Sequence, residues 1–115
     1  MFCYIFGGKN ITIFGYDSSW FIPTEIYPKA GYWIKSNVSF DVTLTGNEVL
    51  DKDIILNNGW NLVGYPYLEE NNVAALYANQ VVYSYNGSWV SHNPNMTFNS
   101  LQALSSGQGY WIKYN

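Results

Sequence analysis

The pentapeptide Gly-Tyr-Trp-Ile-Lys occurs twice in this chain of 115 residues, at positions 31–35 and again at positions 109–113. Each copy follows an aromatic stretch with one pattern: apolar, aromatic, small, Tyr, two turn residues, Ser, Trp, apolar. This stretch occupies residues 13–21 and recurs 69 positions later at residues 82–90. Self-similarity of this kind is the sign of a duplicated structural unit. The sequence therefore predicts two related β-hairpins, each leading to a strand built on Gly-Tyr-Trp-Ile-Lys.

The two units are unequal in length. Residues 26–37 match residues 104–115 at a shift of 78, so the later copy carries nine more residues, in the Asn-rich stretch around residues 92–99. Only the later copy is preceded by Gly-Trp-Asn-Leu-Val-Gly-Tyr-Pro, at residues 59–66. We therefore interpret the chain as a single domain, residues 1–115. It comprises the rear half of a repeat unit, residues 1–45, and one complete unit, residues 46–115.

Two explanations of the incomplete unit stay open. In one, the chain belongs to a longer tandem array and the missing front half lies upstream. In the other, the half-unit completes its sheet with another strand, either residues 2–6 or a strand from a neighbouring subunit. The second explanation would be β-strand addition across an exposed sheet edge.

Turn residues arrive every eight to twelve positions, and the runs between them are rich in Ile, Val, Tyr, Phe, Trp and Thr. This rhythm is typical of an all-β sandwich or barrel. We expect an antiparallel sandwich or open barrel with an internal pseudo-repeat. The expected strands are residues 2–6, 11–16, 19–22, 32–35, 38–45, 53–56, 60–64, 81–85, 88–91 and 110–114.

Local signals refine this expectation. Asn86-Gly87 between two aromatic strands predicts a type I′ hairpin, and Asn57-Asn58-Gly59 predicts a second hairpin after residues 54–56. Asn71 and Asn72 can cap a helix over about residues 71–79, in which Val73, Leu76 and Tyr77 have helical spacing. A further single turn is expected at residues 99–104, with Leu101 and Leu104 pointing inward.

Composition excludes several classes of function. Only 11% of the residues are charged, against about 25% in a typical domain, and the net charge is −3. Five lysines and no arginine cannot form the basic patch that nucleic-acid binding requires. No apolar run reaches 18 residues, so we expect no membrane span. The single cysteine, Cys3, allows no internal disulfide and is expected to be a small buried hydrophobe.

Catalytic chemistry finds little support in the sequence. The only histidine, His92, lies in Ser-His-Asn-Pro without a second histidine, a cysteine or a carboxylate pair nearby, and we expect an exposed loop residue. Asp51 and Asp53 could bind calcium only with backbone help, and a solvated turn is the simpler interpretation. We therefore expect no enzymatic activity, no cofactor and no metal. A small hydrolase would require two carboxylates that converge in one pocket.

The combination of residues 53–113 resembles a known kind of module. A Gly-Trp-Asn-Leu-Val-Gly-Tyr-Pro stretch is followed by a Val-x-x-Leu helix, a Tyr/Trp hairpin and Gly-Tyr-Trp-Ile. This is similar to tandem β-rich modules of cell-surface and secreted proteins, often S-layer-associated, in methanogenic archaea and some bacteria. The resemblance implies an extracellular structural or adhesive module. A weaker resemblance is to a kelch-type propeller blade, which would need several copies to close.

The aromatic side chains are the remaining candidates for a binding role. The tryptophans that occupy equivalent positions in the two copies are expected to pack the core, because one Trp buries a large area. Exposed tyrosines could instead form a platform for a sugar, which makes a carbohydrate-binding module the alternative function. The candidate platform residues are Tyr65, Tyr67, Tyr83 and Tyr85.

Asn-x-Ser/Thr sequons occur at Asn10, Asn37, Asn86 and Asn95, where chance would give about two. They are candidate glycosylation sites of an exterior protein. We expect a module that acts by packing with neighbouring copies or with other surface-protein domains, through β-edge addition, and glycans are a further candidate partner.

Overall fold

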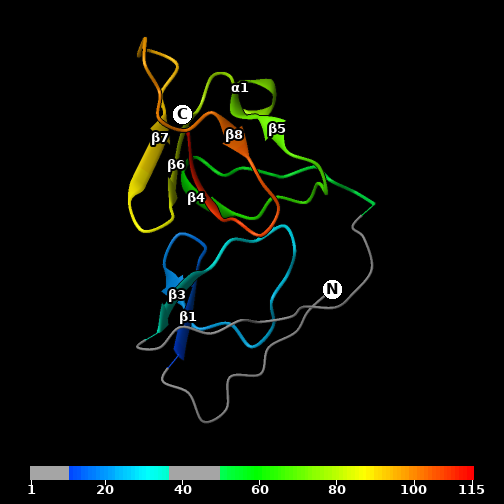
Figure 1. Ribbon diagram of the computed structural model, residues 1–115. Helices are drawn as coiled ribbons and strands as arrows, with labels where there is room; N and C mark the ends of the chain where they lie inside the picture. The colour runs from blue at the N-terminus through cyan, green and yellow to red at the C-terminus, as the bar shows by residue number, and fades with distance from the viewer. Residues whose placement is uncertain (1–10, 37–49) are drawn as a thin grey trace.

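The computed structural model describes residues 11–36 and 50–115, and in these residues the chain is mainly β-structure with one short helix (Figure 1). The described strands form three antiparallel sheets. In spatial order, the first sheet contains β2 (Trp20–Phe21), β1 (Ile11–Tyr16) and β3 (Trp33–Ser36). The second contains β4 (Gly59–Val63), β9 (Tyr110–Tyr114), β6 (Val81–Tyr85) and β7 (Trp89–His92). The third pairs β5 (Asn71–Asn72) with β8 (Ala103–Leu104).

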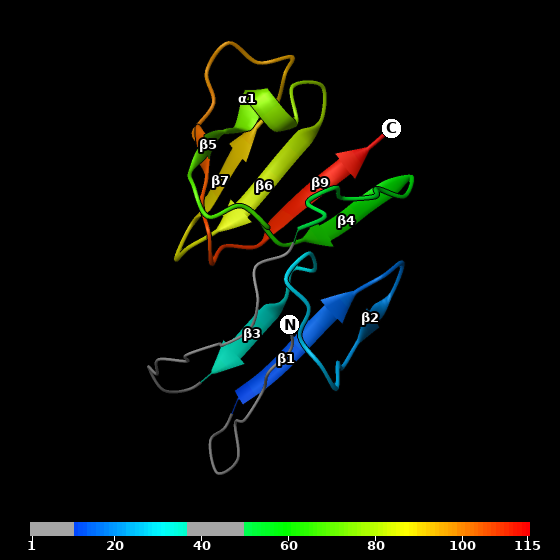
Figure 2. The same cartoon turned by 90° about the vertical axis from the view of Figure 1, so that its right-hand side faces the viewer.

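The sheets stack in layers around the second sheet. Helix α1 (Val73–Leu76), β5 and β8 lie on one side of it, and the first sheet lies on the other side (Figures 1 and 2). The hydrophobic core lies between the second sheet and the layer of α1, β5 and β8. Its buried members are Val63, Tyr65, Val73, Val82, Leu101, Leu104, Tyr110 and Ile112.

Alternation of side chains along its strands explains how the second sheet packs against the layer of α1, β5 and β8 on one face and against the first sheet on the other. Val82 and Ser84 of β6 are buried on the core side, whereas Tyr83 and Tyr85 between them point to the opposite face. Successive side chains of a strand point to opposite faces, so a strand of this kind supplies the core with one set and the first sheet with the other.

The register of the strands reproduces the sequence repeat. Ile13 of β1 pairs with Ile34 of β3, and their equivalents Val82 and Ile112 pair in the second sheet. The hairpins agree as well, since Gly15 pairs with Phe21 in one and Ser84 pairs with Val90 in the other. The first sheet therefore has the strand order and register of β7, β6 and β9, and it has no described counterpart of β4.

Local hydrogen bonds recur too. The hydroxyl of Tyr32 accepts a hydrogen bond from the Tyr27 backbone N–H at 2.9 Å, and the hydroxyl of Tyr110 accepts one from Ser105 at 2.8 Å. Burial raises the pKa of both tyrosines. The duplication is therefore conserved down to the turn that precedes each Gly-Tyr-Trp-Ile-Lys strand.

The all-β prediction with one short helix is confirmed, and the sheets stack without forming a closed barrel. The helix is shorter than the predicted residues 71–79. It is capped by Asn72, whose side chain accepts a hydrogen bond from the Ala74 N–H at 2.9 Å. No helix in residues 11–36 or 50–115 is long and apolar enough to cross a membrane.

Several local predictions are wrong. Residues 53–56 form no strand. Residues 99–104 form no helical turn, since 99–102 are irregular and Ala103–Leu104 is β8, although Leu101 and Leu104 do point inward. The Asn86 hairpin is not of type I′, because only Gly87 has a positive φ and three residues connect the strands. The predicted strands at residues 2–6 and 38–45, together with Cys3, lie outside the described residues.

Candidate functional site

Aromatic rings from the first and second sheets meet between the two layers. We call this cluster the aromatic seam. Its members from the first sheet are Phe14, Tyr16, Trp20 and Trp33, and those from the second sheet are Tyr83, Tyr85, Trp89 and Trp111. In the sequence repeat these are four equivalent pairs, in the order given. The seam is therefore built by the duplicated residues themselves.

Ring contacts within each hairpin are the same in both copies. The centroids of Tyr16 and Trp20 are 5.3 Å apart, and those of Tyr85 and Trp89 are 5.1 Å apart. A second contact joins Trp20 to Phe14 at 6.2 Å, and its equivalent joins Trp89 to Tyr83 at 6.3 Å. All four contacts have the steep interplanar angles of edge-to-face pairs, a favourable geometry for aromatic rings.

Contacts across the seam are reciprocal. Trp111 of the second sheet contacts Tyr16 at 5.2 Å and Trp20 at 5.6 Å. Its equivalent, Trp33 of the first sheet, contacts Tyr85 at 5.3 Å and Trp89 at 5.9 Å. In a two-fold symmetric dimer, each contact of one residue with another is matched by the reverse contact. The two repeats meet in this way within one chain.

The symmetry of the seam is approximate. Trp33 and Trp89 are stacked, with an interplanar angle of 16°, whereas Trp20 and Trp111 meet edge to face at 74°. Trp60 of β4 adds a contact to Tyr83 at 5.7 Å, and the ammonium of Lys113 lies 5.9 Å from the Trp60 ring. Both contacts depend on β4, and the described first sheet contains no strand in the corresponding place.

The seam opens to solvent as a cleft of about 610 Å³ lined by Phe14, Trp20, Trp33, Trp89 and Trp111. Trp20 and Trp89 are each 53% exposed. The prediction that the duplicated tryptophans pack the core is therefore wrong. Trp33 and Trp111 are half-buried in the seam and do not belong to the core cluster. Trp20 and Trp89 lie on β2 and β7, which are edge strands of the described sheets, so each of these two rings has a solvent-facing side. All five lining side chains present ring surface, and none carries an ionisable group.

His92 lies away from this cleft, on the other face of the second sheet. It ends β7 and is buried at 8% exposure, so the prediction of an exposed loop histidine is wrong. The strand extends one residue further than expected, and alternation turns this side chain in the same direction as Val90, which packs on the core. Within the described part of the chain, its Nε2 has no hydrogen-bond partner.

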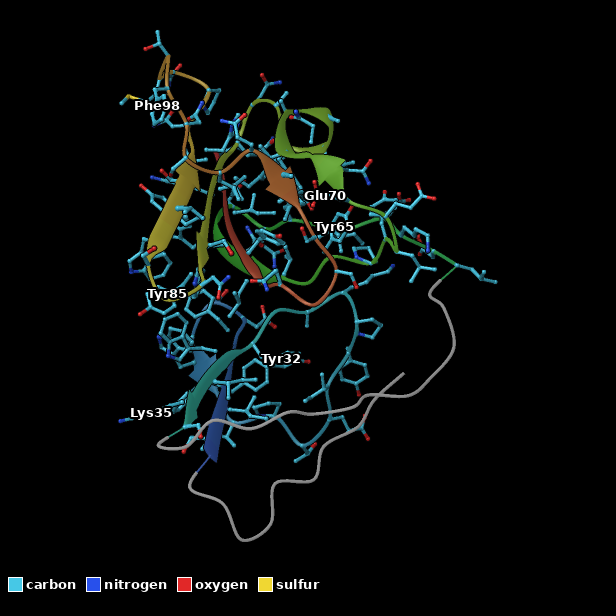
Figure 3. The ribbon with its side chains drawn as sticks, in the orientation of Figure 1. Tyr32, Lys35, Tyr65, Glu70, Tyr85 and Phe98 are labelled. Atoms are coloured by element: carbon cyan, nitrogen blue, oxygen red, sulfur yellow. The ribbon has the colours of Figure 1, made fainter. Side chains whose placement is uncertain are left out.

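The four candidate platform tyrosines do not form one surface. Tyr65 belongs to the buried core, donates a hydrogen bond to the Glu69 carbonyl oxygen and packs against Tyr67 at 5.3 Å. Tyr83 and Tyr85 are 37% and 46% exposed and belong to the seam. Figure 3 shows Tyr85 at the boundary between the two sheets and Tyr65 well inside the upper layers. Tyr65 and Tyr67, which follow β4, lie with the core, whereas alternation along β6 turns Tyr83 and Tyr85 to the opposite face of the second sheet.

A second cavity, of about 620 Å³, lies between the residue 15–32 segment and β4 with its preceding residues. Three carboxylates line it, those of Asp17, Glu25 and Asp53. The carboxylate of Glu25 accepts a hydrogen bond from the Tyr27 hydroxyl and raises the pKa of that phenol.

Close backbone approach joins the two repeats beside this cavity. The N–H of Gly31 donates to the Leu62 carbonyl at 3.2 Å, and the N–H of Gly64 donates to the Lys29 carbonyl at 3.0 Å. Glycine is required here, because a Cβ on Gly64 would lie 2.4 Å from the Pro28 carbonyl oxygen. Gly31, which begins the first Gly-Tyr-Trp-Ile-Lys copy, thus makes a backbone contact between the two repeats.

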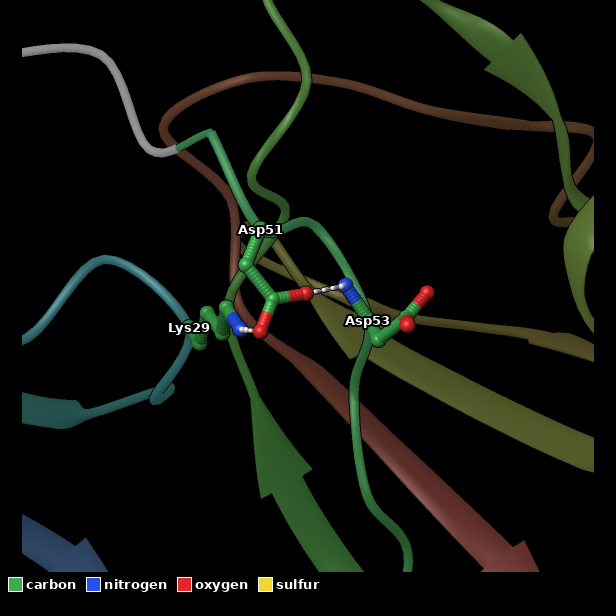
Figure 4. A network of polar contacts seen from close by, with 3 residues as sticks. All are labelled: Lys29, Asp51 and Asp53. Carbon is green, nitrogen blue, oxygen red and sulfur yellow. Dashed lines mark hydrogen bonds and ion pairs between the residues drawn. The ribbon is translucent and has the colours of Figure 1, made fainter.

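The acidic pair predicted to be a solvated turn is held in a small network (Figure 4). One carboxylate oxygen of Asp51 accepts a hydrogen bond from the Asp53 backbone N–H at 3.1 Å, and the other lies 3.3 Å from the Lys29 ammonium. These two contacts, in that order of size, lower the pKa of Asp51. Among the described residues, no group of three or more His, Cys, Asp or Glu side chains is placed to hold a metal ion.

Two of the candidate glycosylation sites are described, and both are exposed. Asn86 lies in the hairpin between β6 and β7, and Asn95 lies in the loop that follows β7. Asn10 and Asn37 lie outside the described residues.

Comparisons of the chain with family models, curated proteins and solved structures found no match.

Proposed function

We propose that this chain is a non-enzymatic structural or adhesive module of an extracellular cell-surface protein, which acts by packing against neighbouring modules or subunits. One observation carries the proposal: the residues that the two repeats share are those that hold the repeats together. Trp33 and Trp111 each bind the hairpin of the other repeat. A chain whose duplicated side chains are used for packing between repeats has the properties expected of a building unit of a larger array.

Composition supports the same proposal. The low charge and the abundance of Asn, Ser, Gly and Tyr suit close packing between uncharged surfaces. The exposed sequon residues Asn86 and Asn95 are accessible to a glycosylating enzyme, as an exterior location would require. The resemblance of residues 53–113 to surface-protein modules supports the location.

Fractionation of the source cells, followed by detection with an antibody raised against the purified chain, tests the location. We expect the protein in the envelope or secreted fraction, cross-linked by a short amine-reactive reagent to itself or to other surface proteins. Peptide mass spectrometry of the same material would detect glycans on Asn86 and Asn95. Recovery in the cytosolic fraction, without partners, would refute the proposal.

Carbohydrate binding is a second candidate, and the open aromatic cleft favours it. Trp20 and Trp89 flank the cleft and expose ring surface to solvent. A mainly apolar concave site of this size is suitable for a small ligand. Titration with cell-wall glycans should change the tryptophan fluorescence of the chain, and Trp20→Ala or Trp89→Ala should abolish the change. Phe98→Ala, in an exposed loop remote from the cleft, is the control.

A further inference from the structure

We propose that the first sheet binds a strand-and-helix segment of the same type as residues 53–77, which adds to the outer edge of β3 in the register that β4 has on β9. The proposal rests on the proposed function as a packing module and names the kind of partner. The molecule already contains one example of this complex, because the second sheet carries such a segment.

The second unit shows how the segment binds. Strand β4 pairs with β9 along its length, placing Trp60 opposite Lys113, Asn61 opposite Ile112 and Leu62 opposite Trp111. The chain then continues into α1, whose Val73 packs in the core over the second sheet. With this cover in place, Val82 and Ile112 have no exposed surface.

The equivalent face of the first sheet has much less cover. Ile34 pairs with Ile13 as Ile112 pairs with Val82, and both isoleucines face away from the seam. Yet Ile34 is 48% exposed, whereas Ile112 is fully buried. Among the described strands, β3 ends the first sheet on this side. Ile34 therefore gives this end strand of the described sheet exposed apolar surface, and an edge strand is a template for pairing with another chain segment.

Equivalent positions give the expected contacts of the partner. Asn61 donates from its side-chain amide to the Ile112 carbonyl at 3.2 Å, so the partner asparagine should donate to the carbonyl of Ile34. Trp60 contacts Tyr83 and lies under Lys113. The partner tryptophan should therefore reach Phe14 and Lys35, which occupy these places in the first unit. Lys35 is exposed.

The chemistry of these contacts makes the partner specific. Main-chain hydrogen bonds of an added strand provide affinity for any extended peptide, and the alternate side chains select among peptides. Here a Trp for the aromatic side and an Asn for the Ile34 carbonyl must stand next to each other, as they do in Gly-Trp-Asn-Leu-Val. A generic β-strand lacks this pair.

A synthetic peptide that copies residues 53–77 of this chain is the probe. It would be titrated into the full ¹⁵N-labelled chain while amide resonances are followed by NMR. We expect saturable shifts at residues 33–35, in the first sheet, with the resonances of β9 unchanged. A peptide carrying Trp60→Ala should bind at least tenfold more weakly, and so should one carrying Asn61→Ala.

Ile34→Glu in the chain should abolish binding, because it places a charge on the face that the segment would cover. The matched control is Phe98→Glu, an exposed aromatic in the loop after β7. The spectrum of each variant reports whether it is folded. If Ile34→Glu does not fold, Ile34→Thr and the map of shifts in the unaltered chain still decide.

Two outcomes would overturn the proposal. The first is an absence of binding at millimolar peptide, which would mean that the edge of β3 does not accept the segment. The second is a shift pattern centred on β9, which would mean that the peptide merely exchanges with β4. Neither result bears on whether the protein is found in the envelope fraction, so failure of this inference and failure of the proposed function are distinguishable.

Discussion

Replacement of Asn61, the polar residue of β4, by alanine should strongly destabilise the chain. The side chain is buried at 8% exposure. Its Oδ1 accepts a hydrogen bond from the Asn57 N–H at 2.9 Å. Its amide nitrogen lies at 2.9 Å from the Asn57 carbonyl, 3.2 Å from that of Gly59 and 3.2 Å from that of Ile112. One side chain thus closes the turn before β4 and ties it to β9.

The magnitude follows from the number of hydrogens. The amide NH₂ group has two hydrogens, which the three carbonyl oxygens share, and Oδ1 accepts one further hydrogen bond. About three hydrogen bonds are therefore lost in Asn61→Ala. A hydrogen bond contributes about 0.5–1.5 kcal/mol net, and more where a buried partner is left unsatisfied. We therefore expect Asn61→Ala to cost about 2–4 kcal/mol, a large part of the roughly 5–15 kcal/mol by which a domain is stable.

Equilibrium unfolding in urea, followed by tryptophan fluorescence, measures this loss as a lower midpoint at unchanged slope. Asn58→Ala is the matched control, because Asn58 is exposed and its side-chain oxygen accepts a hydrogen bond from the amide of Asn115, which is also exposed. We expect that control within about 0.5 kcal/mol of the unaltered chain. Equal stability of the Asn61→Ala and Asn58→Ala variants would refute the reasoning.

Three further predictions concern backbone and ionisation. Ser18→Gly should stabilise the chain by up to about 1 kcal/mol in thermal unfolding, because Ser18 has φ +64° in an exposed hairpin; a loss would contradict this. Gly64→Ala should cost about 1–3 kcal/mol, since the added Cβ would lie 2.4 Å from the Pro28 carbonyl oxygen, whereas Gly109→Ala, with a nearest contact of 3.7 Å, serves as control. Burial raises the pKa of Tyr77 to about 12, so between pH 10 and that value the unfolded state releases a proton that the folded state keeps. The free energy of unfolding should therefore fall as the pH rises through this window, and Tyr77→Phe should make this fall smaller. Urea unfolding at pH 9 and pH 11 measures the fall, and an equal fall in the two chains would count against the prediction.

Local patterns predicted most of the strands. The bounds of β1, β6 and β9 agree with the prediction residue for residue, because each is an aromatic or β-branched run with turn residues at both ends. Strands β5 and β8 were not predicted. Each has two residues, and they pair over a distance of about thirty residues, so no local pattern indicates them.

The apolar run at residues 53–56 shows the limit of such patterns. A hairpin with β4 was expected from the turn at Asn57-Asn58-Gly59. In the structure, the Asn61 side chain binds both the N–H and the carbonyl of Asn57. Backbone groups beside the turn are thus satisfied by a side chain, and no ladder forms there. The Asn61 side chain replaces a neighbouring strand as the hydrogen-bond partner of Asn57 because its contact with Ile112 of β9 holds it in place.

Aromatic residues of the candidate site were visible in the sequence, but their arrangement was not. The repeat identified the equivalent pairs, and it could not indicate that Trp33 contacts the hairpin of the other repeat. The face that a strand presents is set by alternation, but what covers that face is set by the docking of sheets. For the same reason, Tyr65 and Tyr85 were grouped in one platform although they lie on different faces.

The duplication, the β1–β2 and β6–β7 hairpins and the strand that each Gly-Tyr-Trp-Ile-Lys forms can be predicted from the residue order, because these features depend on neighbours a few residues away. The reciprocal ring contacts between the repeats, and the half-exposed Ile34 where Ile112 is buried, appear only in the folded molecule. Both depend on which sheet faces are brought together, and side-chain alternation offers either face equally.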